Sequence, residues 1–452
     1  MKKNKKKAFT LVELLAVILI LAVILIIAVP QIMKTIKETK LKTMEDSAKL
    51  IATNADKDYL AQQAVNANYN VTSIPCSDVA KLSDDYSNCS ITYDSNGVAT
   101  VKLKGASGGK FGKIKCTGTK DEMNCTEITP LPGYSDAVEL LMSKYNNGTN
   151  GEGLIKVEHD TSAIPKATAV EYRYQGSNPN NYVYFNCTNN NNPTSSTCEV
   201  WRIVGLFDGR VKLVRRDSIG SFSWDTSPKT GAGSANGGYG INQWGPSGTY
   251  TGADLMRELN TDYLDPTLLA NANWYSGNNN NLGSGNFNKN YALKESAQEL
   301  IGDAIWYLGA IPYNGIITLA DAYAAERGTI GKLCSSGGFC NDTVIRTFEW
   351  VGKVGLVYPS DFGYASGNSN CTIDNISSSN TYCDTDWMGN YGWLLSSAPT
   401  SSDARGVWYT FSGHIVKNNA DNTTAVRPSV YLIPGVQMKG SGTLSNPYVF
   451  AE

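Results

Sequence analysis

Residues 9–33 form an apolar run in which Glu13 is the only charged side chain. At about 1.5 Å per residue, roughly 20 helical residues cross the ~30 Å hydrocarbon layer, so this run predicts a membrane-spanning helix. Five lysines precede it, at positions 2, 3, 5, 6 and 7. Because lysine-rich flanks stay in the cytoplasm, we expect the N-terminus there, the helix in the inner (cytoplasmic) membrane, and the remaining chain outside.

The carboxylate of Glu13 is unexpected inside this apolar run. A charged side chain at the centre of a membrane helix costs about 2.5–3.5 kcal/mol on insertion scales, and such residues usually have a dedicated partner. The stretch that contains it resembles the processing site of type IV prepilins and pseudopilins. The residues that carry this resemblance are Ala8, Phe9, Thr10, Leu11, Val12 and Glu13.

The resemblance implies a role for each of these positions. A prepilin peptidase would cut between Ala8 and Phe9 and methylate the new amino group, which Glu13 of an adjacent subunit would neutralise. Pro30 stands 21 residues after Phe9, where pilins commonly kink or melt their helix, as a missing N–H would cause. The family usually has Gly where this chain has Ala8. Implied partners are the peptidase, other pilin subunits and the membrane, and the implied destination is an extracellular filament or the cell surface.

Two simpler interpretations compete with this one. An ordinary secretory signal has a shorter apolar core and a cleavage site after it, and a glutamate within the core argues against it. A plain signal anchor fits the hydrophobicity but leaves the spacing of Glu13 from Ala8 and Phe9 without a reason. The prepilin interpretation accounts for all three residues.

The rest of the chain is polar and long enough for two or three domains. It has 452 residues, of which 18% are charged and 10% are aromatic. The first 42 residues hold nine Lys and two Glu, which leaves 30 basic and 39 acidic side chains. An excess of acidic groups disfavours nucleic acid as a partner, because its binding depends on neutralising phosphates.

The ten cysteines fall into sequence neighbours, which predicts five local disulfides on the outer side of the membrane. The pairs are Cys76 with Cys89, Cys116 with Cys125, Cys187 with Cys198, Cys334 with Cys340, and Cys371 with Cys383. A nested arrangement of the first four remains open. No CxxC occurs and the chain has only two histidines, so no metal site is expected among the cysteines.

The pattern divides the chain into five segments. Residues 1–8 are the leader, residues 9–65 a long helix whose outer half is amphipathic, residues 66–128 a small antiparallel sheet, residues 129–134 a linker, and residues 135–452 a large outer domain. Apolar residues near helical spacing beyond the membrane run are Ile32, Ile36, Leu41, Met44, Leu50, Ile51 and Leu60. A long helix on such a sheet is similar to a pilin head.

The outer domain mixes strands and helices, so the fold class is α+β. Strands are expected at residues 171–174, 182–185, 201–206 and 210–215, the last two joined through Asp208 and Gly209 as a hairpin. Helices are expected at residues 135–144, with Ser135 or Asp136 as N-cap, and at 253–260, 294–310 and 320–326.

The outer domain carries a second resemblance. Motifs around Trp201, Trp393, Trp408, Arg427 and Pro428 resemble a bacterial surface-domain group similar to formylglycine-generating-enzyme and C-type-lectin-like folds, over residues 134–452. Such folds host unrelated activities. We expect the tryptophans to fill the core, and Arg427 to pair with a buried carboxylate.

No residue set predicts an enzyme. No cysteine pair matches the copper-binding pair of formylglycine-generating enzymes, and a hydrolase would need His159 or His414 as base. We interpret the first as part of a turn with Asp160 and the second as a half-exposed hairpin residue. Carboxylate pairs such as Asp254 with Glu258 are expected on solvated faces. No cofactor is expected, with calcium at residues 383–390 as the alternative.

Two functional classes follow. In the first, a minor or tip pilin-like subunit displays an adhesin-like domain that binds a surface, glycan or protein. In the second, a pseudopilin has a purely structural role in a secretion or competence filament. A head of roughly 390 residues is bulky for repeated lateral packing, which favours a low-abundance subunit.

Overall fold

The computed structural model describes most of the chain. The described residues are 11–66, 69, 71, 73–74, 76, 79–81, 83, 85–105, 109–112, 114–128, 131–146, 153–190, 192–227, 240–248, 250–266, 289–312, 317–329, 344, 346–368, 371–373, 383, 386–399 and 405–451. The description excludes the side chains of residues 11–30, 32, 33, 73, 87, 88, 146 and 386. Contacts between residues divide the chain into two units, residues 1–129 and 130–452.

The first unit is built on one long helix, α1 (Leu11–Val65), which continues through Pro30 without a break. The prediction of a long N-terminal helix is therefore confirmed. The membrane span expected at residues 9–33 rests on side chains outside the described set. In the part of the chain that the structure describes, no helix is both long and apolar enough to cross a membrane.

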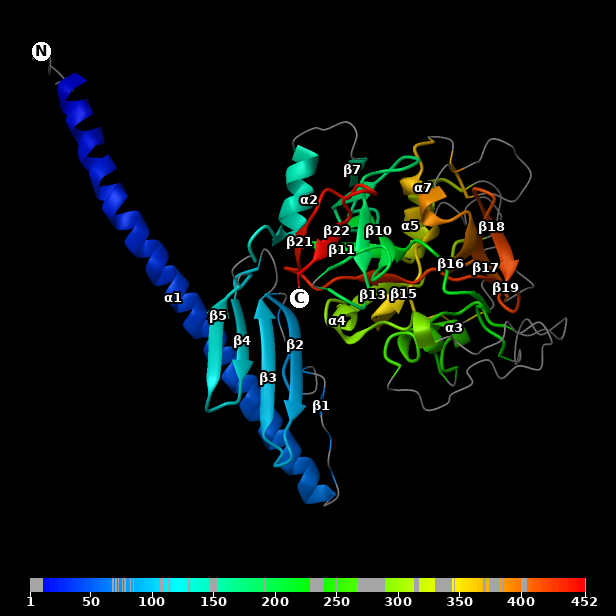
Figure 1. Cartoon of the computed structure of the whole chain (residues 1–452), viewed down its shortest axis with the longest axis horizontal. Coiled ribbons are helices and arrows are strands. Elements are labelled where there is room, and N and C mark those ends of the chain that lie inside the picture. Colours follow the sequence, from blue (N-terminus) through cyan, green and yellow to red (C-terminus); the bar gives the residue numbers. More distant parts are fainter. Residues whose placement is uncertain are drawn as a thin grey trace, which may run out of the picture. The chain divides into compact units, whose positions relative to one another are not determined.

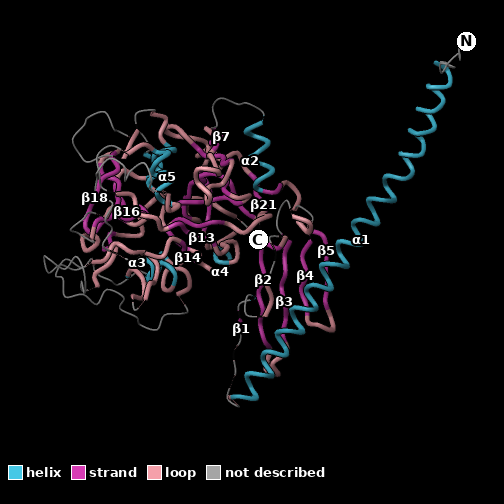
Figure 2. The backbone as a smooth tube through the Cα atoms, turned by 180° about the vertical axis from the view of Figure 1, so that it is seen from behind, coloured by secondary structure: helices cyan, strands magenta, loops and turns pink. Residues whose placement is uncertain are grey.

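A five-stranded antiparallel sheet packs on the C-terminal half of α1, as Figures 1 and 2 show. Its strands are β1 (Ser73–Ile74), β2 (Tyr86–Tyr93), β3 (Ala99–Gly105), β4 (Ile114–Gly118) and β5 (Met123–Glu127), in that order across the sheet. Burial alternates along β3, which points Ala99, Val101 and Leu103 into the core. The predicted small antiparallel sheet is confirmed.

The face that α1 buries matches the expected apolar stripe at Met44 and Ile51 but not throughout. Met44, Ala48, Ile51, Ala52, Ala55 and Tyr59 are at most 4% exposed and line the core with the sheet. Leu50 and Leu60, which we expected in the apolar stripe, are 61% and 64% exposed. Small alanines at helical spacing let the sheet approach the helix backbone, and the hydroxyl of Tyr93 donates to the carbonyl of Ala55 at 3.1 Å.

The second unit combines short helices with several sheets. Its helices are α2 (Ala137–Asn146), α3 (Asp254–Asn260), α4 (Glu295–Gln298), α5 (Leu319–Glu326) and α7 (Pro359–Ala365), with 3-10 turns η3 (Lys289–Tyr291) and η4 (Asp386–Met388). Its strands are β6 (Ser135–Asp136), β7 (Leu154–Glu158), β8 (Val170–Tyr174), β9 (Tyr182–Phe185), β10 (Glu199–Phe207), β11 (Arg210–Arg215), β12 (Ser221–Ser223), β13 (Ala304–Tyr307), β14 (Glu349–Gly352), β15 (Val354–Gly355), β16 (Tyr391–Ser397), β17 (Gly406–Phe411), β18 (His414–Asn419), β19 (Thr423–Ala425), β20 (Ser429–Tyr431), β21 (Gln437–Lys439) and β22 (Tyr448–Phe450).

A ten-stranded sheet forms the centre of this unit. Its main path runs β15-β20-β11-β10-β9-β22-β21-β6, and β8 pairs with both β10 and β7. The β22–β9 pairing is parallel and the others are antiparallel. Three smaller sheets are separate from it: β12 pairs with β19, β13 pairs with β14, and the third sheet has the order β16-β17-β18. The α+β class is confirmed.

The β10–β11 hairpin shows why local sequence sets this part of the fold. Asp208 and Gly209 both have positive φ, 49° and 69°, as a two-residue turn matching the twist of the strands requires. The four predicted strands and this hairpin are confirmed. Helix α2 begins after Asp136, whose Oδ1 accepts from the backbone N–H groups of Val138 and Glu139.

One predicted helix is wrong. Residues 294–310 contain only the single turn α4, and Ala304–Tyr307 forms strand β13 instead. Gly302 interrupts the helical pattern, and the following residues alternate between buried and exposed, with Trp306 buried and Ile305 half exposed. Alternation with period two fits a strand paired with β14.

The buried face of α1 generates a stability prediction. Replacing Ala48 with Leu adds volume to a fully buried helix–sheet contact, so we expect the free energy of unfolding to fall by about 1–3 kcal/mol. Leu50→Ala on the exposed face serves as the matched control and should change it by about 0.5 kcal/mol or less. Chemical denaturation of the detergent-solubilised protein measures both, and equal effects would contradict this assignment of faces.

Candidate functional site

The structure describes the expected processing and assembly residues only in part. Ala8 and Phe9 fall outside the described residues, and Glu13 and Pro30 are described only as backbone within α1. Their predicted roles therefore remain predictions from the sequence. Cys334 and Cys340, and Asp384 of the considered calcium loop, are also outside the described residues.

The described cysteines form the expected local disulfides. The bonds join Cys76 to Cys89, Cys116 to Cys125, Cys187 to Cys198, and Cys371 to Cys383. Nested pairing of the first four, which the sequence left open, does not occur. Within the described residues, no group of three or more His, Cys, Asp or Glu side chains is placed to hold a metal ion.

The motif residues of the second resemblance lie in the core of the second unit. Trp201, Trp393 and Trp408 are at most 2% exposed. The indole N–H groups of the latter two donate to the backbone carbonyls of Phe222 and Ile311. Pro428 uses its carbonyl to accept from the N–H of Arg215 at 3.0 Å.

Arg427 differs from its expected role. Among the described residues, its guanidinium donates to the backbone carbonyls of Arg216 and Tyr391 rather than to a carboxylate. It therefore links the first residue of β16 to the residue that follows β11. Gly389 and Gly392 make room for this side chain, because a Cβ at either position would lie within 3 Å of it.

Strands of the central sheet and nearby helices bring together a cluster of buried ionisable side chains, which we call the buried charge cluster. It comprises His159, Glu171, Arg173, Lys212, Glu326, Arg327 and Asp361, whose side chains are at most 7% exposed. Strands β8 and β11 and helices α5 and α7 supply most of it. Sequence reasoning placed His159 in a turn and did not identify the cluster.

Two carboxylates organise the cluster. Glu171 accepts from Arg173 at 2.6 Å, from the hydroxyl of Tyr323 at 2.7 Å, and contacts Nε2 of His159 at 3.0 Å. Asp361 is held by Nη1 of Arg173 at 2.7 Å and by Nζ of Lys212 at 2.5 Å. Buried charges are costly unless paired and hydrogen-bonded, and here each carboxylate meets more than one donor.

The protonation states follow from this arrangement. Burial opposes ionisation of Glu171, but Arg173, His159 and Arg327 outweigh it and lower the pKa of Glu171 to about 2. Burial likewise opposes ionisation of Asp361, yet Lys212 and Arg173 hold its pKa below the usual value. For Lys212 the balance reverses, because burial lowers its pKa and Asp361 only partly offsets that.

Helix α3 carries a second group of buried carboxylates. Asp254 and Glu258 are 1% and 2% exposed, which corrects the expectation of a solvated helix face. Asp225 is fully buried nearby, and its Oδ1 and Oδ2 accept from the hydroxyl of Ser227 and the N–H of Ile241. Burial and the neighbouring Asp254 raise the pKa of Asp225 to about 7. Protein donors hold Asp225 and Asp254 in place.

The three-stranded sheet β16-β17-β18 presents aromatic side chains to solvent. Tyr391 and Phe411 are 42% and 50% exposed, and Tyr409 is half-buried beside them. The three ring centroids are 6.1–6.2 Å apart, so the rings touch one another. We call Tyr391, Tyr409 and Phe411 the aromatic face. His414, opposite Phe411 in the predicted hairpin, is partly exposed beside it.

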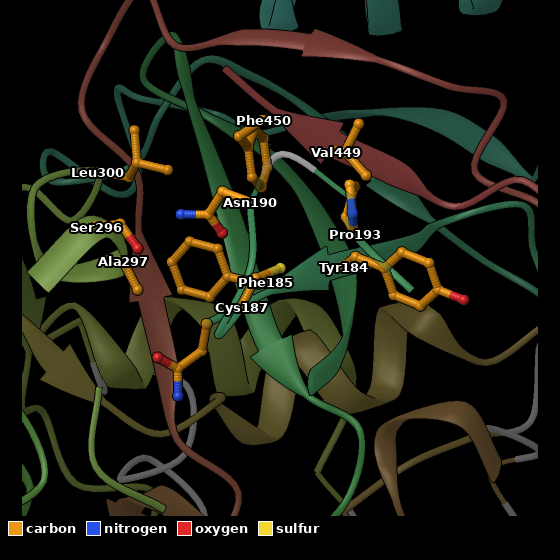
Figure 3. A pocket seen from close by; sticks show the side chains of 11 residues that line it. Tyr184, Phe185, Cys187, Asn190, Pro193, Ser296, Ala297, Leu300, Val449 and Phe450 are labelled. Carbon is orange, nitrogen blue, oxygen red and sulfur yellow. The ribbon is translucent and has the colours of Figure 1, made fainter. Parts of the chain in front are cut away.

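A small cavity lies between β9, α4 and β22, and Figure 3 shows Phe185, Asn190 and Phe450 among its lining side chains. Its volume is about 30 Å³, enough for a water molecule but not for a substrate. Among the described residues that line it, none is Asp, Glu, His, Lys or Arg.

Comparison with known proteins bears on the N-terminus. Residues 3–29 match the family model of the prokaryotic N-terminal methylation motif. The match spans Ala8, Phe9 and Glu13, and it supports a type IV pilin-like or pseudopilin protein that a prepilin peptidase processes and that is anchored in the membrane before assembly. No curated protein and no solved structure matches the chain. The lectin-like and pilin-like fold assignments stay predictions.

The buried carboxyl of Glu258 should make the free energy of unfolding depend on pH. Its Oε1 has no hydrogen-bond partner among the described residues, and burial, with the nearby Asp262, raises its pKa to about 8. A carboxyl whose pKa is higher in the folded than in the unfolded protein lowers the free energy of unfolding. This loss grows as the pH rises from the unfolded-state pKa to the folded-state pKa. We expect Glu258→Gln to increase the free energy of unfolding at pH 7 by on the order of 1–3 kcal/mol.

Near pH 4, the Glu258→Gln variant and the wild type should have the same free energy of unfolding, because the carboxyl is protonated in both the folded and the unfolded protein. Denaturant unfolding between pH 4 and pH 9 measures the difference. Glu139→Gln, at the start of α2 and exposed, is the control for a general charge effect. A gain for Glu258→Gln that does not depend on pH would contradict the prediction.

Proposed function

We propose that this chain is a minor or tip subunit of a type IV pilin-like filament, whose second unit binds a ligand at the cell surface. The observation that carries the proposal is the combination of a methylation motif at residues 3–29 with a second unit that has its own hydrophobic core. The motif supplies membrane anchoring and assembly, and the second unit is not needed for either.

The first unit fits the assembly role. Its outer helix half carries an exposed apolar set, Ile36, Leu50 and Leu60, on the side that the sheet leaves open. Glu13 stands five residues into the chain after the cut expected before Phe9. An unpaired carboxylate at that depth is costly, so pairing with the terminal ammonium of a neighbouring subunit supplies both neutralisation and register.

The aromatic face supports the binding role. Exposed Tyr and Phe offer large, rigid contact area at low entropic cost, which is why aromatic residues are enriched where proteins bind ligands. The other side of the same sheet is anchored in the core by Trp408, so the face is rigid before it binds. A purely structural pseudopilin, the alternative, gives no reason for these rings to be in solvent.

The assembly part is tested at Glu13. We expect Glu13→Ala to leave the protein in the membrane, because the substitution makes the helix more apolar, and to reduce its incorporation into filaments at least tenfold. Immunoblotting of sheared filaments against membrane fractions measures the ratio. Glu38→Ala, an exposed carboxylate on the same helix, is the matched control. Normal incorporation of the Glu13 variant would refute the pairing.

The binding part is tested on the aromatic face. Phe411→Ala should weaken attachment of the displayed unit to its target surface about tenfold or more without lowering its unfolding temperature appreciably, because the ring is half exposed. Phe348→Ala, equally exposed next to β14, is the control and should attach normally. The measurement is attachment of cells that carry equal amounts of filament. Unchanged attachment of the Phe411 variant would contradict the proposal that the aromatic face binds the target.

A further inference from the structure

We propose that Lys212 and Asp361 condense within the folded protein to an amide bond that joins strand β11 to helix α7. Nζ of Lys212 lies 2.5 Å from Oδ2 of Asp361, and the two side chains are 0% and 1% exposed. Groups fixed at such a distance react as parts of one molecule, which removes much of the entropic barrier to bond formation. This bond does not depend on the proposed function.

The surroundings of Lys212 favour the reactive, uncharged amine. Four aromatic rings enclose the nitrogen, with centroids 4.5–5.5 Å away, from Phe207, Trp306, Tyr358 and Tyr431. Burial lowers the pKa of Lys212 despite the opposing effect of Asp361. A desolvated lysine with a lowered pKa is the form in which lysine acts as a nucleophile. The same enclosure excludes water, which would otherwise favour hydrolysis.

A third carboxyl group, that of Glu326, interacts electrostatically with both Lys212 and Asp361, and we assign the proton transfer to it. Both oxygens of Glu326 accept from Ser360, the residue before Asp361, at 2.9 Å and 2.5 Å. Burial, partly offset by Arg327, raises the pKa of Glu326 to about 7, so the group can take up and release a proton near neutral pH. Arg173, Lys212 and Arg327 face Glu171, Asp361 and Glu326, and moving one proton from Lys212 to Glu326 leaves the net charge of the cluster unchanged.

The bonds and protons balance without another reactant. Lys212 gives one proton to Glu326, and its nitrogen lone pair attacks Cγ of Asp361 to form the C–N bond. The Cγ–Oδ2 bond then breaks, and Oδ2 leaves as water with one proton returned from Glu326 and one from the nitrogen. An ammonium and a carboxylate thus become an amide and a water molecule, and nothing is oxidised or reduced.

Arg173 makes the carboxylate open to attack. Its Nη1 holds Oδ1 of Asp361 at 2.7 Å and offsets the negative charge that would repel the lone pair. The same contact stabilises charge on Oδ1 in the tetrahedral intermediate, as a preorganised donor does in acyl transfer. Oδ1 then remains as the amide oxygen, and the partners of Arg173 stay in place.

Mass spectrometry of the reduced, denatured protein tests the proposal directly. We expect the wild-type chain to be lighter than its processed sequence by the mass of one water, and trypsin to yield one branched peptide that contains Lys212 and Asp361. Lys212→Arg should restore the full mass. The full mass in the wild type under denaturing conditions would overturn the proposal, leaving only a buried ion pair.

Two further variants separate the chemistry from folding. Glu326→Gln keeps the size of the side chain and should leave most of the protein without the link while circular dichroism shows a folded chain. A fully linked Glu326 variant would overturn the role of Glu326 in proton transfer. Lys156→Arg alters the exposed pair of Lys156 with Glu158 and should leave the loss of one water unchanged.

Discussion

Asp361 accepts hydrogen bonds from Arg173 and Lys212, and this contact of one carboxyl group with two basic side chains organises the second unit. The three side chains come from helix α7 and from strands β8 and β11, so elements distant in sequence meet at a single charged group. Removing one partner would leave a buried charge uncompensated, which typically costs 3–5 kcal/mol. Four aromatic rings surround Lys212, and Arg173 also binds Glu171, so these contacts connect Asp361 to the rest of the buried charge cluster.

Features governed by short stretches of sequence were predictable. Asp208 and Gly209 specify the β10–β11 turn because a two-residue turn needs positive φ at both positions. Asp136 was identified as a possible N-cap because its carboxylate can reach the N–H groups of the next turn. The four described disulfides also followed from proximity along the chain. In each case, the residues that decide the structure lie within a few positions of one another.

Features that depend on distant partners were not predictable. Arg173 and Asp361 are 188 residues apart, and neither has a local pattern that sets it apart from a surface charge. The helical spacing of Asp254 and Glu258 predicts a solvated helix face. In the structure, α3 packs against β12 and β15, and both side chains are buried. The strand at Ala304–Tyr307 was mistaken for helix because Trp306 can pack in either form, and only its pairing with β14 decides. Leu50 similarly faces solvent because alanines occupy the contact with the sheet.

The local disulfides have a consequence for how the chain matures. The four described bonds span 13, 9, 11 and 12 residues. A chain that emerges progressively on the oxidising side of a membrane exposes each cysteine shortly before its own partner and well before the next pair. Oxidation in order of appearance would therefore produce the pairing of these eight cysteines. Such a chain can complete its covalent framework one short loop at a time, while its distant charged groups are still to be brought together.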